Sequence, residues 1–202
     1  MSHVGNDRVV YPGSTHEVLG RRSMQSGEPV RLRDGTKAVI LPFRPVPRAA
    51  IEKAYDELSP ESRFHRFLSS APHLTDSMFH HLVEEVDGVD HIALFLVLEP
   101  DEGPESIIGV ARIIRYQEEP TSADVAVTIR DKWHGQGAAT ALLAALMRQR
   151  PVGVSRIVTV VSADNAAALA MLRRLGPCVV TPAGHGTVKV VVDPLATTDS
   201  PP

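Results

Sequence analysis

The clearest pattern in this sequence is a change in the spacing of apolar residues within the segment Asp124–Leu146. Apolar residues alternate with small or polar ones over Asp124–Arg130, which predicts a strand. From Gly135 onward they recur at intervals of three and four residues, which predicts a helix. The expected first turn of that helix, Gly135–Ala139, is almost without side chains. The segment therefore predicts a strand, a short polar loop and a helix that begins with small residues.

Similar patterns divide the rest of the chain into strands and helices. Asp34-Gly35 lies between two strand-like runs and predicts a hairpin. Ser59-Pro60 predicts the start of a helix, with Ser59 as the N-cap. The expected helices are Pro47–Leu58, Ser59–Leu68, Thr75–Val83, Gly135–Arg148 and Asn165–Gly176. The other expected strands are Val30–Arg33, Thr36–Leu41, His91–Glu99, Glu105–Tyr116, Arg156–Val161, Cys178–Thr181 and Thr187–Val192.

The composition is that of a globular domain, with 202 residues, a net charge of −3 and 43% hydrophobic residues. We expect one domain, residues 29–195, between a flexible leader, 1–28, and a flexible tail, 196–202. The charges are mixed, so neither nucleic acid nor a membrane surface is an expected partner. The single cysteine, Cys178, excludes an internal disulfide, and there is no secretory signal. Both observations favour a cytoplasmic protein.

The small residues at the start of the Gly135 helix would suit an anion. The first N–H groups of a helix have no partner within the helix, and the helix dipole adds positive potential there. Without side chains in the way, a phosphate can approach those groups closely. The glycines are not followed by Lys-Ser or Lys-Thr, which excludes a Walker A loop, and GQGAAT lacks the last glycine of the dinucleotide fingerprint.

The same segment, W-H-G-Q-G-A-A-T-A-L-L, resembles the acetyl-CoA signature of the GNAT superfamily of N-acetyltransferases, Q/R-x-x-G-x-G/A. Gly137 and Ala139 match the two small positions, and His134 stands where the family usually has Gln or Arg. The run A-D-V-A before it is similar to the family's AEVA-type strand. A later run resembles the motif N-x-x-A-x-x-L/M-x-x-x-x-G through Asn165, Ala168, Met171 and Gly176.

This resemblance implies an α/β (α+β) GNAT fold, in which a mixed, curved sheet of six or seven strands is flanked by helices. It implies that acetyl-CoA, the co-substrate, enters where the strands Asp124–Arg130 and Arg156–Val161 splay apart. A kink in the first of these strands would expose an N–H group to the thioester. The residues expected to bind acetyl-CoA are Thr128, Ile129, His134, Gly135, Gln136, Gly137, Ala138, Ala139, Thr140 and Asn165.

Several of these expectations have alternatives. His134 either contacts a phosphate of CoA or is solvated, and Asn165 either bonds the pantetheine amides or caps its helix. No metal is expected, because His80 and His81 would point about 100° apart on a helix.

Acetyl transfer to an amine requires removal of a proton. A lysine with a pKa of about 10.4 is charged at pH 7, and its neutral form costs about 4–5 kcal/mol. Asp124 occupies the place where related lysine acetyltransferases carry Glu, so the resemblance implies that it is the general base, acting through a water. Glu118 and Glu119 are the alternatives. Leu172 stands where many family members have a Tyr general acid, which leaves a non-catalytic acyl-CoA sensor as an alternative function.

The acceptor is expected to be a protein lysine. The runs LSPESRFHRFL and VDGVDHIAL resemble the GNAT domains of bacterial protein-lysine acetyltransferases. That resemblance implies a partner such as an acyl-CoA synthetase; a homodimer is also expected, and a small-molecule amine is the alternative acceptor. The acidic residues that could attract a lysine, or simply form a solvated surface, are Glu84, Glu85, Asp87 and Asp90.

Overall fold

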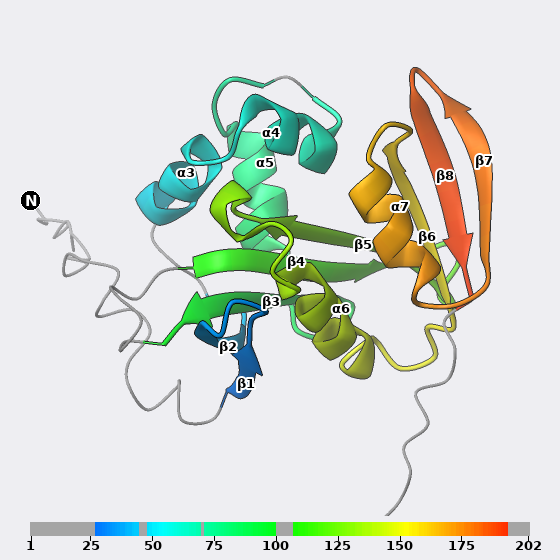
Figure 1. Ribbon diagram of the computed structural model, residues 1–202. Helices are drawn as coiled ribbons and strands as arrows, with labels where there is room; N and C mark the ends of the chain where they lie inside the picture. Colours follow the sequence, from blue (N-terminus) through cyan, green and yellow to red (C-terminus); the bar gives the residue numbers. More distant parts are fainter. Residues whose placement is uncertain (1–26, 45–47, 70, 100–106, 194–202) are drawn as a thin grey trace, which may run out of the picture.

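The computed structural model describes residues 27–44, 48–69, 71–99 and 107–193 (Figure 1). The first strand begins at Glu28, the residue at which we placed the end of the leader. Residues 1–26 of that leader, the tail 196–202 and the turn expected at 100–104 lie outside the described residues.

The described strands form one sheet of eight strands in the order β1-β2-β3-β4-β5-β6-β8-β7. The sheet is mixed, because β5 and β6 run parallel and every other neighbouring pair is antiparallel. Its eight strands correspond to the eight runs expected from the apolar pattern, and they are one or two more than the six or seven that the resemblance implied. The strands are β1 (Glu28–Arg31), β2 (Lys37–Pro42), β3 (His91–Leu98), β4 (Ile107–Arg115), β5 (Ser122–Ile129), β6 (Arg156–Ser162), β7 (Cys178–Gly184) and β8 (Thr187–Val192).

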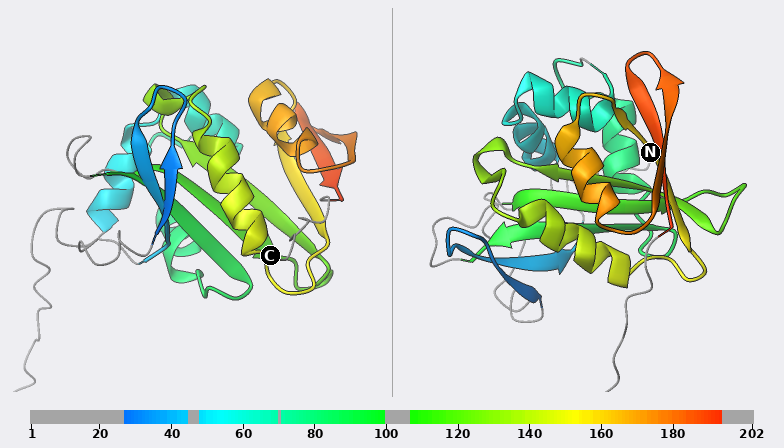
Figure 2. Two further views of the ribbon diagram at one scale, coloured as in Figure 1. Left: turned by 60° about the horizontal axis from the view of Figure 1, so that its bottom comes forward. Right: turned by 45° about the vertical axis from the view of Figure 1, so that its right-hand side comes forward.

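Helices cover both faces of the sheet, as Figures 1 and 2 show. The described helices are α3 (Arg48–Asp56), α4 (Pro60–Phe67), α5 (Asp76–Phe79), the π-helix η1 (His80–Glu84), the 3-10 helix η3 (Asp131–Trp133), α6 (Ala138–Arg148) and α7 (Ala166–Arg173). None of them combines the length and apolarity needed to cross a bilayer. The mixed sheet with helices on both faces confirms the fold class expected from the sequence.

Two predicted helices differ in detail from the observed ones. The helix expected over Thr75–Val83 is α-helical only to Phe79 and continues as the π-helix η1. The helix expected from Gly135 begins at Ala138 instead, because Gly135 and Gly137 have φ angles of 75° and 86°. Such left-handed angles are incompatible with a right-handed helix and are open mainly to glycine.

The main core lies between the sheet and α6. Alternation along β5 sends Val125 and Ile129 to this face, where they pack with Leu142 and Leu146 of α6. Two smaller clusters occupy the other face, under α3, α4 and α5, and are centred on Phe95 and on Tyr55. Residues 124, 126 and 128 of β5 alternate with the core residues and therefore face this second side.

The helix α4 is tied to the segment that follows β5. Ser59 caps α4 as predicted, because its side chain accepts a hydrogen bond from the N–H of Ser62. Asp131 of η3 lies at the same helix end, where it accepts bonds from the Ser59 N–H at 2.8 Å and from the Ser62 hydroxyl. A carboxylate is favourable at a helix N-terminus. This contact therefore fixes α4 relative to the C-terminal end of β5.

We expect Asp131→Ala to lower the free energy of unfolding at pH 7 by about 1–3 kcal/mol, since it leaves the Ser59 N–H without its acceptor. Burial favours the neutral form of Asp131, but the hydroxyls of Ser62 and Ser59 and the Ser59 N–H together hold its pKa below the usual 3.8. Ionisation of Asp131 therefore stabilises the fold above that pH, and the contribution is lost as the pH falls through and below it.

Thermal unfolding at pH 7 and pH 3 measures this effect. The difference in Tm between the parent and Asp131→Ala should be large at pH 7 and smaller at pH 3. Asp193→Ala, which removes only an exposed ion pair with Arg156, is the control and should change little. An equal difference at both pH values would contradict the role given to the ionised Asp131.

Candidate active site

The two parallel strands of the sheet separate soon after they begin. β5 and β6 pair only at Ser122 with Arg156 and at Ala123 with Ile157. Beyond these pairs the strands diverge, and Figure 2 shows the wedge between them. One edge of β5 therefore has no strand beside it from Asp124 onward, which is where the sequence predicted an opening.

The register with β4 decides which backbone groups of β5 face this opening. The N–H of Arg130 donates to Ile108 O of the neighbouring segment at 2.9 Å, and the pairing is continuous from Ala123 to Ile129. In an antiparallel pair, alternate residues bond to the partner strand. The even-numbered residues of β5 therefore bond to β4, and the N–H groups of Val125, Val127 and Ile129 point into the opening.

The expected kink in β5 is not observed as a bulge, because its register with β4 has no shift. The opening arises instead from the divergence of β6. Thr128, expected at the thioester, directs its N–H to β4, while its side chain lies on the face covered by α3–α5. The N–H groups of Val127 and Ile129, on either side of Thr128, are the ones that a bound carbonyl oxygen can reach.

The loop before α6 ends in a helix start with unused donors. Gly137 is the N-cap of α6 and provides no side-chain bond, and the first bond of the helix runs from the Ala141 N–H to Gly137 O at 3.0 Å. The N–H groups of residues 138–140 precede that bond, so they have no acceptor within the helix. Free N–H groups at a helix start are what an anion site requires, and these three belong to Ala138, Ala139 and Thr140, which the sequence predicted to bind acetyl-CoA.

Arg33, at the tip of the β1–β2 hairpin, contacts this loop and was missed by the sequence analysis. Its N–H donates to Gln136 O at 3.0 Å, and its guanidinium donates to Gly135 O at 3.1 Å. A Cβ built on Gly137 would lie 3.8 Å from Arg33 Nε. A cation thus lies beside the start of α6, brought there by a contact that no local sequence pattern reveals.

His134 and Asn165 each have a structural partner. Nε2 of His134 lies 2.8 Å from Ile129 O, so it donates, and the neutral ring keeps only an acceptor at Nδ1. The side-chain oxygen of Asn165 accepts from the Ala168 N–H at 2.9 Å and caps α7. Only the amide nitrogen of Asn165 is left to bind a ligand across the opening.

Asp124 lies on β5 where the opening begins and is half-buried. Burial raises the pKa of its carboxyl above 3.8, while the Thr159 hydroxyl, Arg66 and the Val125 N–H act in the opposite direction. A raised carboxyl pKa improves a general base that works near neutral pH. The geometry therefore suits the role that the resemblance implied for Asp124.

Other acid and base candidates are placed differently. Glu118 and Glu119 are fully exposed on the β4–β5 turn. Leu172, at the usual position of the tyrosine acid, is only 1% exposed and belongs to the core. Tyr116, which the sequence analysis did not consider, donates a hydrogen bond to Val158 O across the start of β5. Burial raises the pKa of Tyr116, and the charge of Asp124 raises it further.

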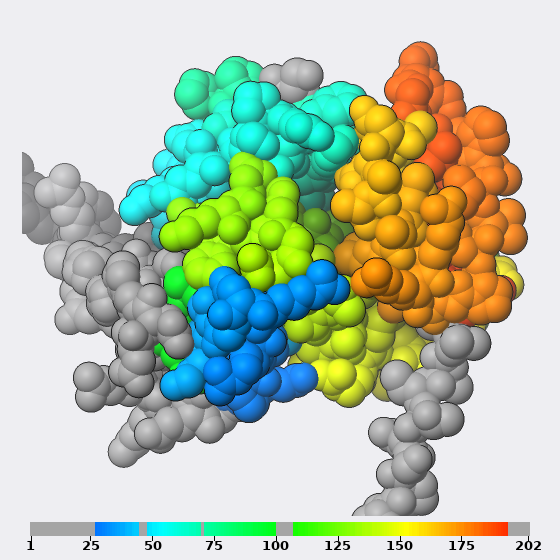
Figure 3. Space-filling model, viewed as in Figure 1, coloured from blue at the N-terminus to red at the C-terminus, as the bar shows by residue number. Residues whose placement is uncertain are grey.

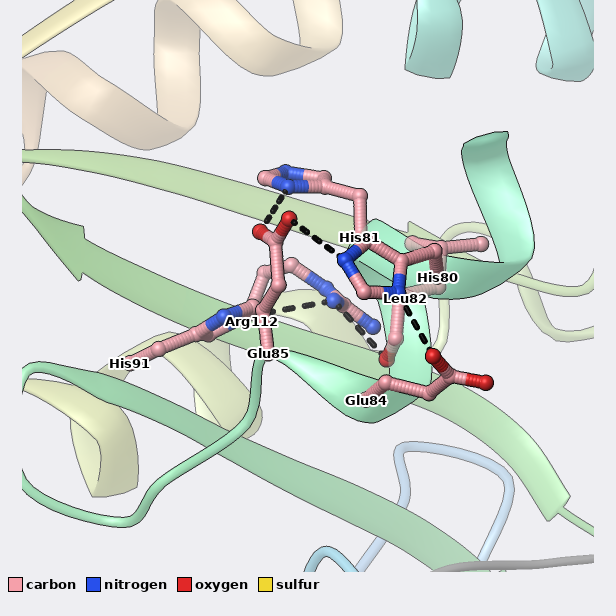
Figure 4. A network of polar contacts seen from close by, with 7 residues as sticks. All are labelled: His80, His81, Leu82, Glu84, Glu85, His91 and Arg112. Atoms are coloured by element: carbon pink, nitrogen blue, oxygen red, sulfur yellow. Dashed lines mark hydrogen bonds and ion pairs between the residues drawn. The ribbon is translucent and has the colours of Figure 1, made fainter. Parts of the chain in front are cut away.

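The acidic residues expected to attract an acceptor all have partners within the chain, and Figure 4 shows those of Glu84 and Glu85. Glu84 pairs with His80 at 2.5 Å and Glu85 pairs with His81 at 2.6 Å. Asp87 accepts three backbone N–H bonds, and Asp90 pairs with Arg115 at 2.7 Å. These carboxylates hold the segment between η1 and β3, so the geometry gives no support to a role in attracting lysine.

The opening fits acetyl-CoA. Figure 3 shows a recess bordered by α4, by the loop before α6 and by α7. Donors for a pyrophosphate lie at one end of it, at Ala138–Thr140, and donors for an extended amide chain lie along β5. Asp124 stands at the far end, so the recess combines a phosphate cradle, a backbone edge and a carboxylate in line.

Comparison with known proteins agrees with this reading. Residues 41–177 match the family model of the acetyltransferase (GNAT) domain. The acetyltransferase Pat of Mycolicibacterium smegmatis is 33% identical over 152 residues, which are 73% of this chain and 43% of that protein. The chain thus spans less than half of that relative.

Solved structures show the same architecture. The GNAT domain of S. lividans PAT superposes with a TM-score of 0.70 at 25% identity, over 84% of this chain and 97% of that one. The cAMP-binding acyltransferase from Mycobacterium smegmatis gives a TM-score of 0.56 at 27% identity, over 91% of this chain and 54% of that one. The family model covers more than half of the chain, and the chain belongs to the GNAT family of acyl-CoA-dependent N-acetyltransferases.

Proposed function

We propose that this chain transfers an acetyl group from acetyl-CoA to the side-chain amine of a lysine in a protein, with Asp124 as general base. The observation that carries the proposal is the position of Asp124, half-buried with a raised pKa at the end of the open edge of β5. The acceptor class rests on the resemblance of two runs, around Leu58–Leu68 and Val86–Leu94, to bacterial protein-lysine acetyltransferases.

Each part of acetyl-CoA has candidate partners. The N–H groups of Ala138, Ala139 and Thr140 would hold the pyrophosphate, and Gly135, Gln136 and Gly137 would let it approach. The N–H groups of Val127 and Ile129 would hold the pantetheine arm and the thioester oxygen, with the Asn165 amide nitrogen on the opposite side. Bound acetyl-CoA supplies a thioester with a good leaving group, so the protein needs few catalytic groups.

The residues of β5 divide the work. Asp124 accepts the proton of the attacking amine, through a water because Asp is shorter than the Glu of related enzymes. The backbone donors at Val127 and Ile129 stabilise the oxygen as it gains negative charge. Leu172 offers no proton to the departing thiolate, so the thiolate leaves unassisted or takes its proton from solvent.

A small-molecule amine as acceptor and a non-catalytic acyl-CoA sensor are the alternatives that the sequence left open. The position of Asp124, half-buried beside the open edge of β5, favours catalysis over sensing, because acyl transfer needs a group that accepts the amine proton and binding alone does not. The homodimer and the cytoplasmic location stay predictions.

We expect Asp124→Asn to lower kcat at pH 7 by about 10²–10⁴-fold and to leave the Kd of acetyl-CoA unchanged, since only proton removal is lost. Part of the loss should be recovered at pH 9, where more of the amine is neutral. The variant should also fold well, because a carboxyl whose pKa is raised by folding is destabilising when ionised at neutral pH.

Steady-state rates from pH 6 to pH 9 test this role, with acetyl-CoA binding measured by calorimetry. Glu118→Gln and Glu119→Gln are matched controls on the exposed turn and should behave like the parent. If Asp124→Asn keeps the parent's rate and pH profile while one of the controls loses activity, the base has been misassigned.

The acceptor class is tested with the purified chain and acetyl-CoA at matched acceptor concentrations. A bacterial acyl-CoA synthetase with an exposed lysine should be acetylated faster than free lysine or a polyamine, as measured by CoA release and by mass spectrometry of the acceptor. Faster turnover of the small amines would reject the protein acceptor and leave the acyl-transfer chemistry intact.

A further inference from the structure

A largely apolar pocket lies between the sheet and the helices α3, α4 and η1. Its volume is about 90 Å³. Since a cavity of about 150 Å³ holds a benzene molecule, this volume has room for roughly three or four carbon atoms. Thr128 of β5 lines it, so it opens beside the strand position expected to hold the thioester. Its other lining residues include Tyr55, Phe67, Leu82, Phe95, Val110 and, among the charged ones, Arg66, Arg112 and Arg130.

Arg112 is the most deeply buried of the charged residues, with 5% of its surface exposed. It lies on β4, and its guanidinium donates to Leu82 O at 3.1 Å and to His91 Nε2 at 3.3 Å (Figure 4). His91 accepts as a neutral ring, because burial and the charge of Arg112 lower its pKa to about 4. No other described residue accepts a bond from Arg112, so its remaining donors are available on the pocket side.

The positive charges of the pocket exceed its negative ones. Among the described side chains, no carboxylate lies within 4.0 Å of Arg66 or Arg112, whereas Arg130 pairs with Glu57 at 2.8 Å. Arg66 is near enough to Asp124 for their charges to interact.

Burial and the neighbouring charge of Arg66 lower the pKa of Arg112 to about 9. The charged neighbour of Arg112 is thus another cation, Arg66, and not a carboxylate. A buried cation without a counter-ion is costly even when it is hydrogen-bonded, and a bound anion would lower that cost.

We propose that this pocket accepts an acyl chain of three or four carbons that ends in a carboxylate, held by Arg66 and Arg112, and that dicarboxylic acyl-CoA thioesters such as succinyl-CoA are donors for this enzyme. The inference rests on the acyl transfer proposed above and adds the class of acyl group.

The register of the sheet supports this arrangement. Arg112 is directly opposite Ala126, and Val110 is opposite Thr128, so Arg112 is the diagonal neighbour of Thr128. Diagonal neighbours are about 7–8 Å apart, a gap that an arginine side chain and a short acyl chain can span. Guanidinium groups bind carboxylates with two parallel hydrogen bonds, which gives the pocket its selectivity for a charged chain end.

The reaction itself is ordinary acyl transfer. The amine nitrogen forms a bond to the thioester carbon, the carbon–sulfur bond breaks, and CoA leaves as a thiolate that is then protonated by solvent. The amine proton passes to Asp124, and the distal carboxylate keeps its charge throughout. No oxidant or further reactant is needed.

The test compares succinyl-CoA with butyryl-CoA, a neutral donor with the same number of carbon atoms. The parent enzyme should show a kcat/KM and an affinity by calorimetry about 10- to 100-fold higher for succinyl-CoA, the range expected for a charged hydrogen bond. Arg112→Met and Arg66→Met should each reduce that preference while acetyl-CoA still binds. Arg156→Met, which removes a guanidinium from an exposed ion pair, is the matched control and should keep the preference.

The outcomes separate this inference from the proposed function. If acetyl groups are transferred but butyryl-CoA is bound and used as well as succinyl-CoA, the acyl class is wrong and the acetyl transfer stands. If no acyl group is transferred, the proposed function fails. In that case the binding measurement still tests the pocket, and equal affinity for succinyl-CoA and butyryl-CoA would overturn its assignment. Arg112 could instead bind a carboxylate of the acceptor. If Arg112→Met lowers the rate with lysine as acceptor but not with lysine amide, the assignment of Arg112 to the acyl group would also be overturned. The comparison in the parent chain does not depend on the folding of any variant.

Discussion

The divergence of β5 from β6 is the constraint on which the rest of the site depends. Backbone N–H and C=O groups inside a protein need partners, and a central strand normally finds them on both sides. Only two residues of β5, Ser122 and Ala123, pair with β6, and beyond Ala123 no strand lies on that side of β5. The N–H groups of Val127 and Ile129 are left facing an opening that an amide-containing chain can fill, as an added strand would. The start of α6 follows the end of β5 after η3 and a short loop that contains Gly135 and Gly137, and it lies beside the same opening.

The two faces of β5 then carry different tasks. One face packs on α6 and makes the core that keeps the cradle in place, with Leu142 and Leu146 fully buried. The other face carries Asp124 and Thr128, on the side covered by α3, α4 and α5. Asp131, bound to the N-terminal end of α4, joins this second face to the loop before α6. A shift of α4 would therefore move both Asp131 and the loop before α6.

Features that depend on local chemistry could be predicted from the sequence. The hairpin at Asp34-Gly35, the N-cap at Ser59 and the order of strands and helices follow from neighbouring residues and from apolar spacing. The start of α6 was placed three residues too early, because small residues fit a helix pattern and only the φ angles of Gly135 and Gly137 exclude them. The π-helix η1 has no comparable local signal in the sequence.

Side chains that come together only through folding could not be predicted in this way. Arg33 contacts the loop before α6 from a hairpin that lies 102 positions before Gly135 in the chain. Arg66 of α4 and Tyr116 at the end of β4 lie near Asp124, and Arg112 of β4 lies near Arg66. No spacing in the sequence links these residues. The sequence predicted the carboxylate and the cradle, whereas the cations beside them, Arg66 and Arg33, are visible only in the fold.

The most direct test is a titration of the amide resonances with acetyl-CoA by nuclear magnetic resonance. This account predicts the largest shifts at the N–H groups of Val127 and Ile129, which face the opening, and at those of Ala138, Ala139 and Thr140. The Thr128 N–H, bonded to β4, should move less than its two neighbours. Saturable shifts confined to other parts of the chain, with Val127, Ile129 and the start of α6 unchanged, would contradict the proposed binding site.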